Sequence, residues 1–253
     1  MFSAFQKMFV AMAWGSLTCV ACAAQQSIVL EHLPPIARRV SAMPRIAHPD
    51  KKQRRINAVL ARYDQTLRRM LSSCKLDHGP PYWDRIIAAS MTGPEFLSFF
   101  IQDNYYCGGT HPDNERMSVV FDLRTGAQVN WETLLPSSLT GTVRTENSAT
   151  STSSVTLKSA RLYKLYLAGY SKPFQEGKDE ASCDEIVRDR DPDDPPEMQA
   201  WLDATHHGLV IQFETNHATQ ACVVPVVIPA QVLRAEGASE RLLNALESHH
   251  GQH

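Results

Sequence analysis

The sequence predicts an α+β fold in which an amphipathic helix near the start of the mature chain packs on a mainly antiparallel sheet. Residues 51–74 place apolar side chains at intervals of three and four, which is the spacing of one helix face. Runs typical of β-strands outnumber helical runs over the rest of the chain. Most connections between these runs are shorter than the crossover that joins two parallel strands. Neighbouring strands should therefore pair as antiparallel hairpins.

The first 24 of the 253 residues have the pattern of a secretory signal peptide. Lys7 is their only charged residue, residues 8–20 are mostly apolar, and small residues flank Cys22 as a cleavage site requires. We therefore expect a periplasmic or secreted protein. Lipidation of Cys22 is an alternative, although Cys19 stands where lipoproteins usually have an aliphatic residue. No later run of the sequence is long and apolar enough for a membrane-spanning helix.

Residues 25–42 contain two adjacent prolines and scattered bases, which indicate an extended or flexible segment. The helix predicted over residues 51–74 carries its arginines mainly on one face. Its other face is apolar and comprises Ile56, Leu60, Tyr63, Leu67, Met70 and Cys74. Two strands, 82–89 and 96–103, should then pair as a hairpin around Gly93.

The next stretch indicates a strand, a tight loop, a strand, a turn and a further strand. Gly108-Gly109 permit positive φ, and Pro112 prevents the loop from rejoining a β-ladder. The two later strands are expected at 117–121 and 127–131, separated by the turn Asp122–Gly126.

The second half of the chain predicts loops, two helices and three strands. We expect a short helical turn at 132–136, a mobile Ser- and Thr-rich surface loop at 137–156, a second amphipathic helix at 157–170 and an acidic loop at 175–197. A hairpin from 201–205 and 209–213 should follow, then an edge strand at 222–228 and a final helix at about 239–247.

Four cysteines remain after removal of the signal segment, namely Cys74, Cys107, Cys183 and Cys222. An even number in an exported chain favours disulfides, and no two of them have the close spacing of a zinc site. Three pairings are possible. We favour Cys74–Cys107 and Cys183–Cys222, because each bridge joins a helix end or loop to a strand within one half of the chain.

The formal net charge of −2 argues against a general nucleic-acid or membrane-surface binder. The charges are nevertheless uneven: segment 38–69 carries ten Arg or Lys against two acids, and segment 176–197 carries ten acids against three bases. Such runs are usually solvated faces. Alternatively, the basic segment presents a basic face to an acidic partner.

Two motifs, Cys-Gly-Gly-Thr-His-Pro at 107–112 and Phe-Asp-Leu-Arg-Thr-Gly at 121–126, resemble the signature of a bacterial cell-envelope domain of unknown function. That domain occurs in the extracytoplasmic part of the anti-sigma factor RsiV and in the accessory N-terminal region of the peptidoglycan deacetylase PdaC. The closing strands and the Pro44-Arg45-Ile46 segment are also similar. The resemblance covers residues 43–234 and leaves 235–253 as a C-terminal helix and tail.

This resemblance implies ligand binding at the envelope, since RsiV binds lysozyme and PdaC acts on peptidoglycan. The chain lacks the Asp-Asp and His-x-x-x-His metal ligands of the deacetylase domain. It also lacks a cytoplasmic anti-sigma segment, so RsiV-type signalling is not implied.

Candidate binding residues lie in the glycine-rich loop: Gly108, Gly109, His111 and Asp113. His111, with Asp113 or Glu115, has the chemistry of a general base or metal ligand. No nucleophile or third ligand accompanies it, so a structural role in the loop is the simpler interpretation.

Two other clusters are weak metal candidates. Asp189, Asp191 and Asp193 alternate as the ligands of a calcium-binding loop do. However, Asp194 stands where that loop requires a Gly, and Ala200 stands where it requires a bidentate Glu. His206 and His207 are adjacent and would point to opposite faces of a strand. We expect neither a metal site nor a cofactor.

We therefore expect an exported, non-enzymatic domain that binds peptidoglycan glycan or an envelope-active protein such as lysozyme. Two alternatives stay open. One is a peptidoglycan hydrolase or deacetylase that uses His111, and the other is a periplasmic immunity protein.

Overall fold

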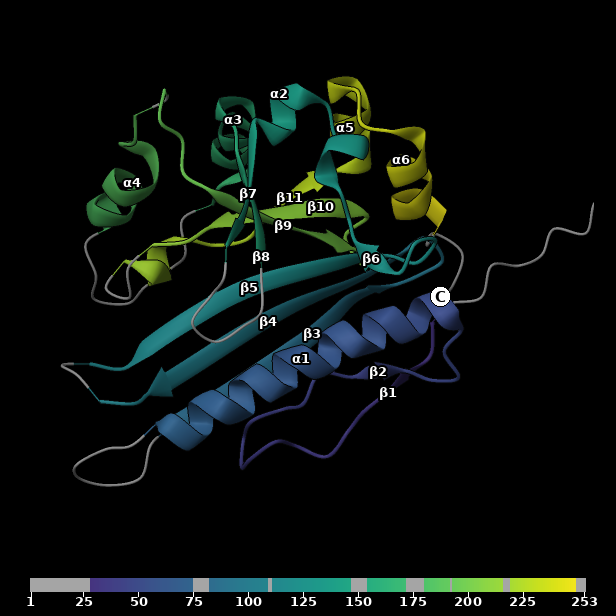
Figure 1. Cartoon of the computed structure of the whole chain (residues 1–253). Coiled ribbons are helices and arrows are strands. Elements are labelled where there is room, and N and C mark those ends of the chain that lie inside the picture. Colours follow the sequence, from purple (N-terminus) through teal and green to yellow (C-terminus); the bar gives the residue numbers. More distant parts are fainter. Residues whose placement is uncertain are drawn as a thin grey trace, which may run out of the picture.

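Two antiparallel sheets lie face to face between two layers of helix in the computed structural model (Figure 1). The structure describes residues 28–74, 82–108, 111–146, 154–171, 180–191, 193–215 and 219–248. The predicted signal segment and the histidine-containing tail lie outside these ranges. The α+β class and the antiparallel pairing of the strands are as predicted.

Helix α1 (Lys51–Ser73) forms the outer layer beneath the first sheet (Figure 1). Asp50 and Gln53 start it with a capping box, in which each side chain accepts a hydrogen bond from the other's backbone N–H, at 2.7 and 2.9 Å. Its buried face includes the predicted Ile56, Leu60 and Tyr63. Because these side chains pack on the sheet, the arginines of the helix face outward.

The first sheet has the strand order β3–β4–β5–β6. Its strands are β3 (Tyr82–Thr92), β4 (Phe96–Tyr106), β5 (Asp113–Asp122) and β6 (Ala127–Gln128). Alternate residues of β4 and β5 pack against α1, namely Leu97, Phe99, Ile101, Met117, Val119 and Phe121. Strand β6 is shorter than predicted because a 3₁₀ turn, η1 (Trp131–Thr133), begins where the strand was expected to end.

Strands β1 (Leu30–Glu31) and β2 (Arg45–Ile46) form a separate two-stranded sheet beside α1. The side chain of Asn57 on α1 holds this sheet, because it accepts from the N–H of Ile46 at 2.8 Å and donates to its carbonyl at 3.0 Å. The two-stranded sheet of the N-terminal segment is therefore fastened to the helix.

The second sheet has the strand order β11–β10–β9–β8–β7. Its strands are β7 (Thr142–Glu146), β8 (Ser154–Lys158), β9 (Met198–Asp203), β10 (Gly208–Phe213) and β11 (Val226–Pro229). The predicted β9–β10 hairpin is confirmed. Strand β11 lies at the edge, as predicted, but starts only after Pro225 because η2 (Gln220–Cys222) occupies the start of the expected strand.

The predicted Ser- and Thr-rich loop over residues 137–156 is wrong where the structure describes it. This stretch contains the short helix α2 (Ser137–Thr140), strand β7 and the start of β8. Thr and Val are good strand formers, and the hydroxyl of Thr156 is bonded to Glu197 at 2.9 Å. The Thr156 hydroxyl thus has its hydrogen-bond partner inside the fold rather than in water.

Helices cover the outer face of the second sheet (Figure 1). They are α3 (Ala160–Gly169), α5 (Ala230–Glu236) and α6 (Glu240–Glu247), and α4 (Glu180–Arg188) lies to one side. Helix α3 starts later than predicted, since Leu157 belongs to β8 and Ser159 caps the helix. Helix α4 replaces part of the predicted acidic loop, and its inner side buries Cys183 and Val187.

Serine side chains of the first sheet fasten the open edge of β9. Among the described residues, β8 pairs with β9 at Gln199 and Met198, and the backbone of β9 after Gln199 has no strand partner on that side. Ser118 Oγ donates to the Ala200 carbonyl at 3.0 Å, and the Leu202 N–H donates to the buried Ser98 Oγ at 3.1 Å. These bonds satisfy buried backbone groups and join the two sheets.

The Asp122–Gly126 turn of the sequence motif touches the start of α1. Asp122 Oδ1 accepts from the backbone of Arg124 at 2.7 Å, and Gly126 has a φ of +73°. Burial opposes ionisation of Asp122, but hydrogen bonds from Arg241 and from the turn backbone outweigh it and lower the pKa of this carboxyl. The turn is therefore a structural joint between β5, α1 and α6.

We expect Gly126→Ala to lower the free energy of unfolding by about 2–3 kcal/mol, because it combines a positive φ with a steric clash. A Cβ at this position would lie 2.3 Å from the Lys52 carbonyl oxygen. Gly237→Ala is the matched control, since its φ is +89° but its Cβ would meet nothing within 4 Å. Urea denaturation should show the larger loss for Gly126→Ala, and equal losses would contradict the close approach.

Candidate functional site

The predicted binding loop forms the tip of the long β4–β5 hairpin (Figure 1). Gly108 has a φ of +102°, so the first glycine adopts the expected positive φ. Gly109 lies outside the described residues. His111 is exposed, and its Nδ1 lies 3.0 Å from the carbonyl oxygen of Pro112. This contact is local to the loop.

Asp113 belongs to a different cluster, on the side of the hairpin that faces α1. It pairs with Tyr105 across the strands, and Tyr105 stacks on Trp83 with ring centroids 4.6 Å apart. Burial, then the charges of Asp113 and its acidic neighbours, raises the pKa of Tyr105 to about 12. The Tyr105 hydroxyl thus stays protonated and hydrogen-bonded to Asp113.

The two predicted disulfide pairings are both present in the structure. Cys74–Cys107 ties the end of α1 to the base of the hairpin tip, and Cys183–Cys222 ties α4 to η2. Within the described ranges no three His, Cys, Asp or Glu side chains gather as metal ligands would.

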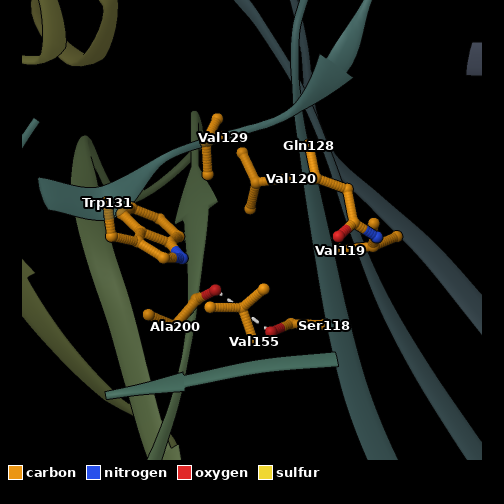
Figure 2. A pocket seen from close by; sticks show the side chains of 8 residues that line it. All are labelled: Ser118, Val119, Val120, Gln128, Val129, Trp131, Val155 and Ala200. Carbon is orange, nitrogen blue, oxygen red and sulfur yellow. Dashed lines mark hydrogen bonds between the residues drawn. The ribbon is translucent and has the colours of Figure 1, made fainter. Parts of the chain in front are cut away.

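A small void lies between the two sheets (Figure 2). It is lined by Ser118, Val119, Val120, Gln128, Val129, Trp131, Val155 and Ala200. Its volume is about 10 Å³, which is the space of roughly one water molecule. Figure 2 shows the Ser118–Ala200 hydrogen bond at its rim. The void is a packing gap between sheets and cannot admit a substrate.

Two larger hollows lie at the surface, one at each end of α1. The first has a volume of about 570 Å³ and is lined by Asp50, Lys51, Lys52, Arg55 and Thr125. The second has a volume of about 580 Å³ and is lined by Ala37, Arg38, Arg39, Val40, Leu71, Tyr82 and Trp83. Both volumes lie in the range of small-molecule sites. We call the second the Arg38–Arg39 groove.

The outer face of α1 between these hollows is basic. Seven basic side chains on it are exposed, namely Lys51, Lys52, Arg54, Arg55, Arg62, Arg68 and Arg69. The single acid within α1, Asp64, is buried and paired with Arg45 at 2.5 Å. At 23 residues the helix is about 34 Å long. We call this surface the α1 basic face.

The basic segment 38–69 was the sequence signal for this surface, but the groove residues were not predicted as a site. Tyr82 and Trp83 were expected only as the start of a strand. The groove forms because the turn at Arg39 lies against β3, where the Arg85 N–H donates to the Arg39 carbonyl at 3.0 Å. Nothing local in the sequence signals that contact.

Together these features define a disulfide-stapled α+β domain with a basic surface and, in the part that the structure describes, no helix suited to crossing a membrane. No family model and no curated protein matches the sequence. Among solved structures, one distant match is a member of the DUF3298 family from Bacteroides fragilis, a domain of unknown function. The two chains share 13% identity with a TM-score of 0.43, and the match covers 80% of this chain and 75% of the other.

Proposed function

We propose that this protein is an exported, non-enzymatic domain that binds the cell envelope, and that peptidoglycan is its ligand. The signal-like first residues and the two disulfides support an oxidising compartment outside the cytoplasm. The resemblance of the glycine-rich motifs to RsiV and PdaC supports the envelope as the place of action.

The single observation that carries the choice of ligand is the α1 basic face. Peptidoglycan is a polymer with free carboxylates on its stem peptides, so a row of exposed bases has the complementary charge. The net charge of the chain is −2, so this positive surface is a local feature rather than an overall excess of base. A strongly basic partner would be repelled from the same face.

The hollows also favour binding over catalysis. The linings of both surface hollows lack His and Cys, and their one carboxylate, Asp50, is committed to capping α1. His111 is exposed at the hairpin tip and belongs to neither lining. A hydrolase or deacetylase that uses His111 remains the alternative that the experiment must address.

Retention on purified peptidoglycan, beside retention on immobilised lysozyme, tests this function. We expect retention on peptidoglycan that falls as salt rises, because screening weakens exposed charge pairs. Arg62→Glu on the α1 basic face should weaken retention at least threefold. Lys164→Glu, which reverses one exposed charge on α3, is the matched control and should leave retention unchanged.

Three results would reject the proposal. Retention on lysozyme alone would make the ligand a protein. A new muropeptide that His111→Ala abolishes would make the protein an enzyme. Failure to be retained on either matrix would leave an immunity function as the better explanation.

A further inference from the structure

We propose that the Arg38–Arg39 groove is a specific subsite for a muropeptide, that is, a disaccharide of the cell wall whose attached stem peptide carries a free carboxylate. This inference rests on the proposed function and adds a defined binding position to it. The α1 basic face attracts the polymer over the length of a helix, whereas the groove recognises one unit.

The backbone of the groove is held in an unfavourable conformation. Arg39 has a φ of +65°, which non-glycine residues rarely adopt. Its neighbours close a tight turn, in which the Val40 N–H donates to the Ala37 carbonyl at 3.0 Å and the Ile36 N–H to the Val40 carbonyl at 2.8 Å. Backbone strain of this kind gathers at sites where a side chain must be held in place.

The two arginines of this turn have different roles. Arg39 is committed, since it forms an ion pair with Asp84 at 2.6 Å and its guanidinium lies 5.5 Å from the centre of the Tyr82 ring. Arg38 is exposed and has no hydrogen bond or ion pair with any other residue that the structure describes. Arg38 is therefore the cation available to a ligand.

Tyr82 and Trp83 form an aromatic wall of the groove. Tyr82 is 40% exposed, while Trp83 is buried and stacks on Tyr105. The disulfide Cys74–Cys107 fastens the end of α1 and the strand of Tyr105 next to this wall. The Tyr82 ring is thus held on a fixed support, which lowers the entropy cost of binding.

This combination selects the chemical class of ligand. The apolar C–H face of a sugar ring packs on an exposed aromatic ring, and a guanidinium pairs with a carboxylate through two parallel hydrogen bonds. The hollow of about 580 Å³ is large enough for a disaccharide with part of a peptide. A carboxylated sugar unit uses both walls of the groove, whereas a neutral sugar uses only Tyr82.

Calorimetric titration of the full chain with a soluble disaccharide–peptide from the wall tests this subsite. Arg38→Gln should weaken binding of that muropeptide about tenfold and leave binding of the neutral N-acetylglucosamine disaccharide unchanged. Tyr82→Ala should weaken binding of both ligands. Lys164→Gln, at an exposed base of α3 outside both the groove and the α1 basic face, is the control and should change neither affinity.

The outcomes separate this inference from the proposed function. If wild type and Arg38→Gln bind the muropeptide equally while peptidoglycan still retains the protein, the groove is not the subsite but the function stands. If peptidoglycan does not retain the wild type, the function itself fails. If inorganic phosphate displaces the muropeptide and binds with the same affinity, the site is not specific for a carboxylate. Thermal melts of each variant exclude misfolding, and Tyr82→Phe, which keeps the ring, should retain binding.

Discussion

Asp103→Ala is expected to lower the free energy of unfolding by about 3–5 kcal/mol, because it leaves a buried cation without its carboxylate. The side chains of Asp103 and Arg85 both have no solvent exposure. Asp103 Oδ1 accepts from Arg85 Nε at 2.7 Å and from Trp83 Nε1 at 3.0 Å, and its other oxygen pairs with Arg85 as well. Urea denaturation followed by circular dichroism measures the loss.

Two further variants show whether burial is the cause. Asp84→Asn removes the carboxylate of a partly exposed pair with Arg39 and should cost about 1 kcal/mol or less. Replacing both buried partners, as in Arg85→Met with Asp103→Leu, should recover most of the loss because no charge then remains buried. A loss below about 1 kcal/mol for Asp103→Ala would mean that water reaches Arg85.

This ion pair illustrates what the sequence could not reveal. Arg85 and Asp103 belong to strands that were predicted as a hairpin from their apolar residues, and the hairpin is present. A charged residue within a predicted strand is ordinarily assigned to the solvent face. Here register places the two charges directly opposite each other on the face toward α1, where they form a buried ion pair.

Local patterns were sufficient where one face of an element is buried against one neighbour. Helix α1 shows this best, since its apolar spacing and its capping residue lie within one segment. Local sequence patterns failed where polar side chains form hydrogen bonds with residues far away in the sequence. Residues 154–156 of strand β8 were assigned to a loop because of their Ser and Thr content, yet Glu197 bonds Thr156 from 41 residues away.

The candidate site divides in the same way. Gly108 and Gly109 were expected at positive φ, and Gly108 adopts it. Gly126, which was expected only as part of a turn, also has a positive φ. The basic run was visible as composition, but the groove depends on Arg39 meeting Arg85 and Asp84 across 45 residues or more. No pattern within either segment encodes that meeting.

Removal of the Cys183–Cys222 bridge is the second change with a large expected effect. Cys183→Ala with Cys222→Ala should lower the free energy of unfolding by about 4 kcal/mol on the chain-entropy model, since the bridge spans 39 residues. Alanine is used in place of serine because both cysteines are almost fully buried, and a serine would bury a new hydroxyl there. Urea denaturation without reductant measures the change.

The loss should be largest around α4. This helix has nine residues, too few to be stable alone, and it packs through Cys183 and Val187. Its described contacts with the core include the Tyr163 hydroxyl, which donates to the Val187 carbonyl, the Arg188 guanidinium 5.5 Å from the centre of the Tyr170 ring, and the bridge to η2. Hydrogen exchange should therefore quicken first in residues 183–188, while the β4–β5 hairpin keeps its protection. Uniform acceleration across both regions would instead show that the bridge acts on the unfolded chain alone, and unchanged stability would mean that packing holds α4 without it.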